Sequence, residues 1–266
     1  MMKHVHHTLW SSWLTYAFCW WFIGCGPSQK DIREQEESAE YHYNLAYGHY
    51  FDSTRPNVDA AMHEVLQSLK AKPDFAKAHM LAGIIYLGRE QYFKAIRHFK
   101  RSIEIEPKYF AAMNNLGAAY LASGRWDDAI EVYKKLVSNI MYGTPGHGHN
   151  NLGWAYFKKG DTRKALQHFS MAVNLAPRLC PAYNNLGMVL ISQRRYPRAK
   201  KYLMRAVKRC PNYAEPYFHL GKIAASGRAF DDAKTYFQTC IKHAGDTPLM
   251  ERCKQRMLAI SPTAVP

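Results

Sequence analysis

Residues 114–136 read NNLGAAYLASGRWDDAIEVYKKL, and this stretch decides the fold. Its apolar and small residues recur three or four positions apart, which is the period of one face of an α-helix. Leu116 and Gly117 belong to a first predicted helix, and Ala129 and Tyr133 belong to a second. A small residue where two helices cross lets their backbones approach closely, while larger apolar residues fill the space beyond. The stretch therefore predicts a helical hairpin.

The same markers recur along the chain at a nearly constant interval. A glycine returns after 34, 36, 34 and 34 residues, at Gly83, Gly117, Gly153, Gly187 and Gly221. A small residue follows in the same rhythm, at Ala95, Ala129, Ala165, Ala199 and Ala233. Four residues later stand Phe99, Tyr133, Phe169, Leu203 and Phe237. Proline ends four units, at Pro73, Pro107, Pro177 and Pro211. The period predicts an array of stacked hairpins.

This pattern resembles the tetratricopeptide repeat throughout residues 41–245. The resemblance implies an all-α fold, a right-handed superhelical solenoid of six helical hairpins with a capping helix in residues 246–266. Two units depart from the pattern. The first carries extra residues in DSTRPNVDA, which predicts a longer turn between its helices. The third lacks its closing proline, and its boundary IMYGTPGHGH is expected to be a glycine-rich joint.

The N-terminus has the features of an export signal. An apolar run from Leu9 to Ile23 has the length of a signal-peptide core and is shorter than the roughly 20 residues of a spanning helix. The run ends in Phe22-Ile23-Gly24-Cys25, which resembles a bacterial lipobox. That resemblance implies a signal peptide over residues 1–24 and a diacylglyceryl group on the Cys25 thiol. A signal peptide cleaved elsewhere and an uncleaved anchor are the alternatives.

The residues after the lipobox bear on where the chain is held. Residues 25–40 are predicted to form a lipidated cysteine and a polar tether, with the start of a helix as the alternative. Gly26 follows the cysteine, and by resemblance to exported lipoproteins this favours the outer membrane, with the chain facing the periplasm. Acyl chains would anchor the protein without a spanning helix.

The chain is strongly basic, with a formal net charge of +15 from 36 Lys and Arg against 21 Asp and Glu. Nucleic-acid binding is one interpretation of such a balance. Along the sequence, however, the basic residues do not gather into one stripe, and no zinc-finger, RRM or basic-zipper pattern occurs. We therefore expect no nucleic-acid partner, and a solvated basic surface that suits acidic partners or anionic lipid headgroups.

No motif for catalysis or cofactor binding is present. The sequence lacks a P-loop, a Rossmann glycine pattern, a nucleophile elbow and a His-Glu-x-x-His motif. His147 and His149 form a GHGH stretch that is able to hold a metal, but two loop histidines are more often surface residues. We expect no enzyme activity, no cofactor, no metal and no small-molecule substrate.

Four cysteines follow the predicted signal and lipobox, at Cys180, Cys210, Cys240 and Cys253, and they allow three pairings. Cys180 begins a first helix and Cys210 ends the antiparallel second helix, so these two ends meet. Cys240 faces the closing helix that carries Cys253. Because an exported protein meets oxidising conditions, we favour both of these disulfides. The alternative is four small buried hydrophobic residues.

In tetratricopeptide repeats the first helices line the concave side, which implies a peptide-binding groove here. By register, its levels contain Asn114, Asn150 and Asn184; then Ile84, Trp154 and Met188; then Leu87, Leu121, Phe157 and Ile191. By resemblance to other such repeats, an asparagine ladder binds the backbone of an extended peptide and apolar neighbours add contact area. The alternative is that these residues serve local packing. The middle units lack the basic pair of a carboxylate clamp, which argues against a cytosolic co-chaperone.

A lipobox, a tether and six repeats together resemble the PilF/PilW/Tgl family of type IV pilus lipoproteins. The resemblance implies a pilotin that helps an outer-membrane secretin reach the membrane and form its multimer, with a secretin segment in the groove. One rival hypothesis is an envelope scaffold for peptidoglycan enzymes or another secretion system. Another is an accessory subunit of an enzyme.

Overall fold

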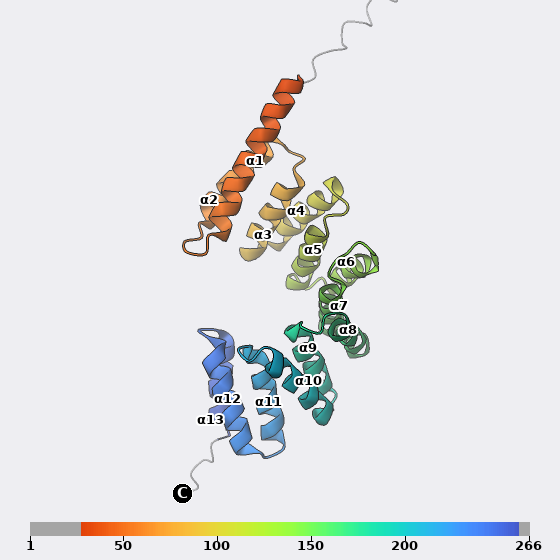
Figure 1. The fold of residues 1–266 in the computed structure, drawn as a ribbon, viewed down its shortest axis with the longest axis vertical. Coiled ribbons are helices and arrows are strands. Elements are labelled where there is room, and N and C mark those ends of the chain that lie inside the picture. Colours follow the sequence, from red (N-terminus) through yellow and green to blue (C-terminus); the bar gives the residue numbers. More distant parts are fainter. Residues whose placement is uncertain (1–27, 261–266) are drawn as a thin grey trace, which may run out of the picture. The chain divides into compact units, whose positions relative to one another are not determined.

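The computed structural model describes residues 28–260, and this part of the chain contains thirteen α-helices and no strand (Figure 1). Odd-numbered helices are the first, and even-numbered helices the second, of each hairpin. The predicted architecture of six hairpins and a closing helix is confirmed. The helices are α1 (Gln29–Phe51), α2 (Val58–Ala71), α3 (Ala76–Gly88), α4 (Tyr92–Ile105), α5 (Phe110–Ala122), α6 (Trp126–Ser138), α7 (Pro145–Lys159), α8 (Thr162–Leu175), α9 (Cys180–Ser192), α10 (Tyr196–Arg209), α11 (Ala214–Ser226), α12 (Phe230–Ala244) and α13 (Pro248–Leu258).

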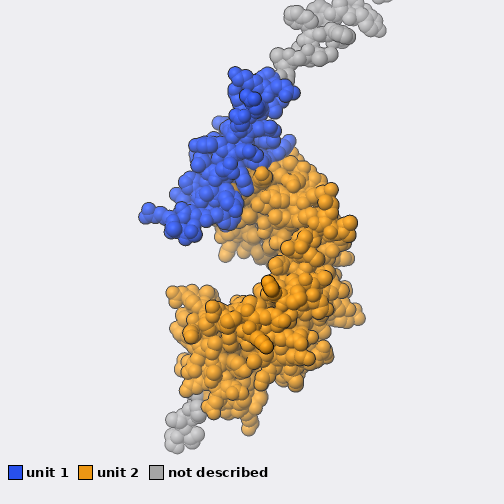
Figure 2. Space-filling model, in the orientation of Figure 1, with its two compact units in different colours: residues 1–75 blue, residues 76–266 orange. Residues whose placement is uncertain are grey.

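The chain forms two compact units, one ending at residue 75 and one beginning at residue 76 (Figure 2). In the first unit, α1 begins at Gln29, where Ser28 and Asp31 form a capping box. Ala39 is buried, and its carbonyl oxygen accepts a hydrogen bond from Ser68 Oγ at 2.7 Å. From Gln29 onward the prediction of a tether is therefore wrong and the alternative, the start of a helix, is confirmed, because these residues form the first half of α1.

The turn between α1 and α2 spans residues 52–57, whereas the next hairpin turns within residues 89–91. The longer turn predicted in DSTRPNVDA is thus confirmed. The predicted signal peptide and Cys25 lie outside the described residues. Within residues 28–260, no helix combines the length and the apolar character that a membrane span requires.

The repeated glycines lie where the two helices of a hairpin cross. A Cβ atom built on Gly83 would lie 2.5 Å from the Phe99 ring, and one on Gly221 would lie 2.7 Å from the Phe237 ring. Any larger residue would push the aromatic ring out of the hairpin. The second small row, from Ala61 to Ala233, is fully buried in all six hairpins. In four hairpins the glycine therefore makes room for an aromatic ring, and in α9–α10 Gly187 makes room in the same way for Leu203.

The glycine-rich boundary is not the joint that the sequence predicted. The loop is residues 139–144, and the GHGH stretch forms the first turns of α7. A Cβ atom on Gly146 would lie 2.5 Å from Ala176 Cβ, and one on Gly148 would lie 2.7 Å from Val137 Cγ1. These glycines permit close helix packing, and the interpretation of His147 and His149 as loop residues is wrong.

Two hairpins contain the same half-buried histidine pair. His79 Nδ1 lies 3.0 Å from His98 Nδ1 in α3–α4, and His149 Nδ1 lies 3.1 Å from His168 Nδ1 in α7–α8. Each second histidine also stacks on a tyrosine, and burial lowers the pKa of His98 and of His168 to about 4, helped by the charge of the paired histidine. In each pair one ring nitrogen donates a hydrogen bond to the other, so the pair links a first helix to its second helix.

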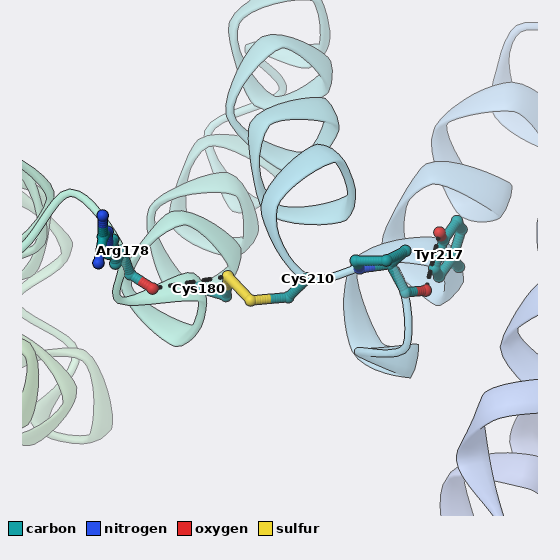
Figure 3. The surroundings of a disulfide bond; sticks show 5 residues. Arg178, Cys180, Cys210 and Tyr217 are labelled. Carbon is teal, nitrogen blue, oxygen red and sulfur yellow. Dashed lines mark hydrogen bonds between the residues drawn. A yellow bond between two sulfur atoms is a disulfide. The ribbon is translucent and has the colours of Figure 1, made fainter.

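Two disulfides lie toward the C-terminus, Cys180–Cys210 and Cys240–Cys253. Figure 3 shows the first, which joins the start of α9 to the residue after α10. Cys180 Sγ lies 3.7 Å from the Arg178 carbonyl oxygen, a polar contact without a hydrogen bond because a bridged sulfur carries no proton. The second disulfide fixes α13 to α12, in a core that includes Phe218 and Phe237.

Candidate functional site

The second unit has a concave side formed by its first helices. Each first helix contacts the first helix of the next hairpin from α3 through α11, and α11 contacts α13. Among the described helices, no second helix contacts another second helix. The stack is therefore tighter along the first helices and curves toward them (Figure 1). Second helices α4 to α12 lie on the convex side.

A cleft of about 590 Å³ opens where α5, α7 and α9 begin. Its walls combine apolar groups from Phe110, Tyr142, Leu179 and Pro181 with side-chain amides. Phe110 and Tyr142 meet edge to face, with ring centroids 5.8 Å apart. Its remaining lining residues are Ala111, Asn114, Gly143, Thr144, His147, Asn150 and Asn151. A mostly apolar hollow with a few fixed polar groups is the usual form of a ligand site.

Asparagine side chains tie the floor of this cleft together. Asn151 Nδ2 donates to Asn114 Oδ1 at 2.8 Å, which joins α7 to α5. Asn185 Nδ2 donates to Asn150 Oδ1 at 3.0 Å, which joins α9 to α7. The bonds hold the amides in place, and each carbonyl oxygen keeps a second lone pair for a ligand. We call these two inter-helix bonds the asparagine rungs.

The structure places the predicted ladder residues in two different environments. Asn114 and Asn150 line the cleft, as the groove hypothesis requires. Asn184 does not line it; it is only 5% exposed, and its Oδ1 atom has no hydrogen-bond partner among the described residues. Asn151 and Asn185 were missed in the sequence. Their signal was the repeated Asn-Asn pair, whose second member reaches back to the preceding hairpin.

The predicted apolar levels lie elsewhere than in this cleft. All seven side chains are half-buried, and all except Met188 pack against the main core: Ile84, Leu87, Leu121, Trp154, Phe157, Met188 and Ile191. Trp154 stacks on Phe157 with centroids 5.6 Å apart, and Lys158 Nζ lies 5.2 Å from the Trp154 ring. Much of the surface of these side chains is covered by packing against the core. The cleft is lined instead by residues nearer the starts of the helices.

Comparison with known proteins agrees with this geometry. One model described as "Tetratricopeptide repeat" matches residues 74–140 and 109–178, and a second with the same description matches residues 180–213. Together these matches include more than half of the chain. The chain belongs to the tetratricopeptide repeat family. Proteins of this repeat family bind peptide or protein partners in a groove, and the cleft lies on the corresponding side.

Curated relatives share only a few repeats with this tetratricopeptide protein. Superkiller protein 3 of Schizosaccharomyces pombe is 36% identical over 67 residues, which are 25% of this chain and 5% of that protein. The chain thus spans a small fraction of the length of that relative. The match shows repeat character and carries no information about the larger protein's activity.

Two solved structures share the fold over most of the chain. PilF of Pseudomonas aeruginosa has a TM-score of 0.68 at 15% identity, covering 84% of this chain and 99% of that one. PilW, described as a widely conserved type IV pilus biogenesis factor, has a TM-score of 0.70 at 19% identity, covering 80% and 97%. At these identities the likeness establishes the fold alone.

Proposed function

We propose that this protein is an outer-membrane lipoprotein that assists type IV pilus biogenesis by helping a secretin reach the membrane and assemble. The observation that carries the proposal is the cleft bounded by α5, α7 and α9, with rigid amides beside aromatic walls. The fold shared with PilF and PilW over nearly their whole length supports the choice of partner. Cys25 and the apolar run before it support the membrane anchor.

The cleft is suited to an extended protein segment. Main-chain N–H and C=O groups of such a segment would pair with Asn114 and Asn150, while Phe110 and Tyr142 would cover an apolar side chain. Because the rungs already hold the amides, the protein loses little side-chain entropy on binding. The protein works as a scaffold in this proposal, and no bond is made or broken.

The test of the cleft uses a strain that lacks the gene and is complemented with variants. Asn114→Ala combined with Asn150→Ala should reduce secretin multimers and pilus-dependent motility by about tenfold, as for loss of two hydrogen bonds to a partner. Asn174→Ala is the matched control, because Asn174 is exposed on second helix α8. Normal multimers in the deletion strain would contradict the proposal. Recovery of peptidoglycan enzymes on the cleft would instead favour an envelope scaffold.

The test of the anchor is separate. The mass of the mature N-terminus from membranes should show a lipid on Cys25, and Cys25→Ala should release or mislocalise the protein. An unmodified N-terminus at another residue would remove the lipoprotein part of the proposal. The cleft would then still be testable as a protein-binding site.

A further inference from the structure

One second helix differs from all the others in the charge of its outward face. The first outward position lies one residue before the buried alanine of the helix. The other three follow three, seven and ten residues after this first position, so all four share one side of the helix. In α10 all four are cations: Arg198, Lys201, Arg205 and Lys208. We call them the α10 stripe. The corresponding residues are mixed in α6 (Asp128, Glu131, Lys135, Ser138), α8 (Lys164, Gln167, Met171, Asn174) and α12 (Asp232, Thr235, Thr239, Lys242).

The α10 stripe is exposed and uncompensated. Ala199, Leu203 and Ala206 on the opposite side of the helix are fully buried, which turns the stripe outward. All four cations are exposed, and none forms an ion pair within residues 28–260. Neither Asp nor Glu occurs between Asp161 and Glu215. Along the sequence these cations looked scattered, but the helix aligns them over about 15 Å.

Helix α4 provides the comparison within the same chain. Three of its corresponding residues are also basic, Lys94, Arg97 and Arg101, but the fourth is Glu104. Glu104 Oε2 lies 3.1 Å from Arg101 Nη1, so this face compensates part of its own charge. Both faces therefore carry Lys and Arg side chains, but the surplus of positive charge is larger on α10 than on α4.

The shape around the α10 stripe favours a broad amphiphilic surface as the partner. The helix lies on the convex side, where no groove would enclose a peptide or a nucleic-acid strand. Between the cations is a shallow hollow of about 490 Å³ lined by Lys201, Met204, Arg205, Val207 and Lys208. Met204 is 42% exposed there. Cations around an exposed apolar side chain match a bilayer interface, where phosphates lie just above acyl chains.

We propose that the α10 stripe binds the anionic phospholipid headgroups of a bilayer. This binding is independent of the cleft and of the lipid on Cys25, and it would hold the convex side of the second unit against the membrane. The cleft, on the concave side, would remain open to a protein. Attraction to an anionic surface amounts to about a fivefold gain in partitioning for each basic residue and decays within a Debye length, so salt should weaken it.

The experiment compares vesicle binding by three full-length proteins that share the same N-terminus. One is unchanged, one carries Arg198→Glu, Lys201→Glu and Arg205→Glu, and the control carries Lys94→Glu, Arg97→Glu and Arg101→Glu. Both variants change the net charge equally. Phosphatidylcholine vesicles measure binding through the apolar N-terminus, and added phosphatidylglycerol measures the charge-dependent part.

Phosphatidylglycerol should raise partitioning of the unchanged protein at low salt, and the α10 variant should lose about 100-fold of that gain. The α4 variant should lose less, at most about 25-fold, because Glu104 leaves a surplus of only two positive charges on that face. Circular dichroism establishes that both variants are folded. Equal losses in the two variants would overturn the proposal by showing an effect of net charge alone. It would also be overturned if the α10 variant kept vesicle binding and lost affinity for an oligonucleotide or an acidic peptide.

Discussion

Two neighbouring junctions between first helices, α7–α9 and α9–α11, place residues of the same repeat positions opposite each other. Their side chains form a hydrogen bond in one junction and none in the other. In the first, Asn185 donates to Asn150, as Asn151 does to Asn114 one hairpin earlier. In the second, the corresponding residues are Asn184 and His219. Asn184 Oδ1 and His219 Nδ1 are both buried, and neither has a hydrogen-bond partner among the described residues.

The two regions are therefore held together by different means. The region from α5 to α9 relies on packing and on the asparagine rungs. The region from α9 to α13 lacks a third rung but contains both disulfides. The difference shows that a sequence period repeats positions, while the bond at each position depends on both residues that meet there. In a solenoid, where each repeat contacts only its neighbours, such differences stay local.

Reduction of the disulfides should have the largest effect on this comparison. The bridged residues are separated by 30 and 13 positions, and closing loops of that size stabilises a fold by about 3 to 4 kcal/mol each. Hydrogen exchange should therefore speed up in α9–α13 on reduction and change little in α5–α8. Equal acceleration in both regions would show that the two are one cooperative unit.

Acid should weaken both regions, the first through His168 and the second through His219. Burial, with the nearby charges of Lys222 and Arg252, lowers the pKa of His219 to about 4, below its value in the unfolded chain. Above pH 6.5 the imidazole is neutral in both the folded and the unfolded chain, so His219 costs no stability. As the pH falls toward 4, the unfolded chain binds a proton that the folded chain does not, and the free energy of unfolding falls by about 3 kcal/mol in total. His219→Asn should remove that part of the pH dependence of unfolding, measured by denaturant titration. An unchanged pH profile in this variant would contradict the assignment.

Removal of one rung should have a smaller effect. Asn151→Ala leaves Asn114 Oδ1 without its donor and should lower the free energy of unfolding by about 1 to 2 kcal/mol. Asn115→Ala is the matched control, because Asn115 has the same register without a side-chain hydrogen bond within residues 28–260. Urea denaturation of the two variants measures the difference, and equal losses would show that the rung adds nothing beyond packing.

Completion of the missing rung should have the smallest effect. His219→Asn places an amide donor opposite Asn184 Oδ1, in the manner of Asn185 and Asn150, and should stabilise the protein by about 1 kcal/mol at neutral pH. His219→Leu is the comparison, since it removes the imidazole without supplying a donor. If both variants have the same midpoint of thermal unfolding, the register does not place the two side chains within reach.

Much of the fold could be predicted from the sequence because its signals are local and repeated. In the last five hairpins the crossing glycine, the buried alanine and the large apolar or aromatic residue four positions later recur within about 20 residues. The first hairpin follows from Ala46 and Ala61, so the number of hairpins could be predicted. The tether was mistaken because residues 29–40 are polar on most sides. Ala39, through its bond to Ser68, and Glu36, through its ion pair with Lys72, show that this segment packs.

The candidate site depended more on tertiary structure. The sequence by itself determined which positions repeat, and hence that Asn114, Asn150 and Asn184 are equivalent. It did not determine that two of them line a cleft while the third is buried, because that depends on the residue that the next hairpin presents. The histidine pairs and the outward stripe on α10 have the same origin. Periodicity sets the direction in which a side chain points, but only the packed structure decides what it meets there.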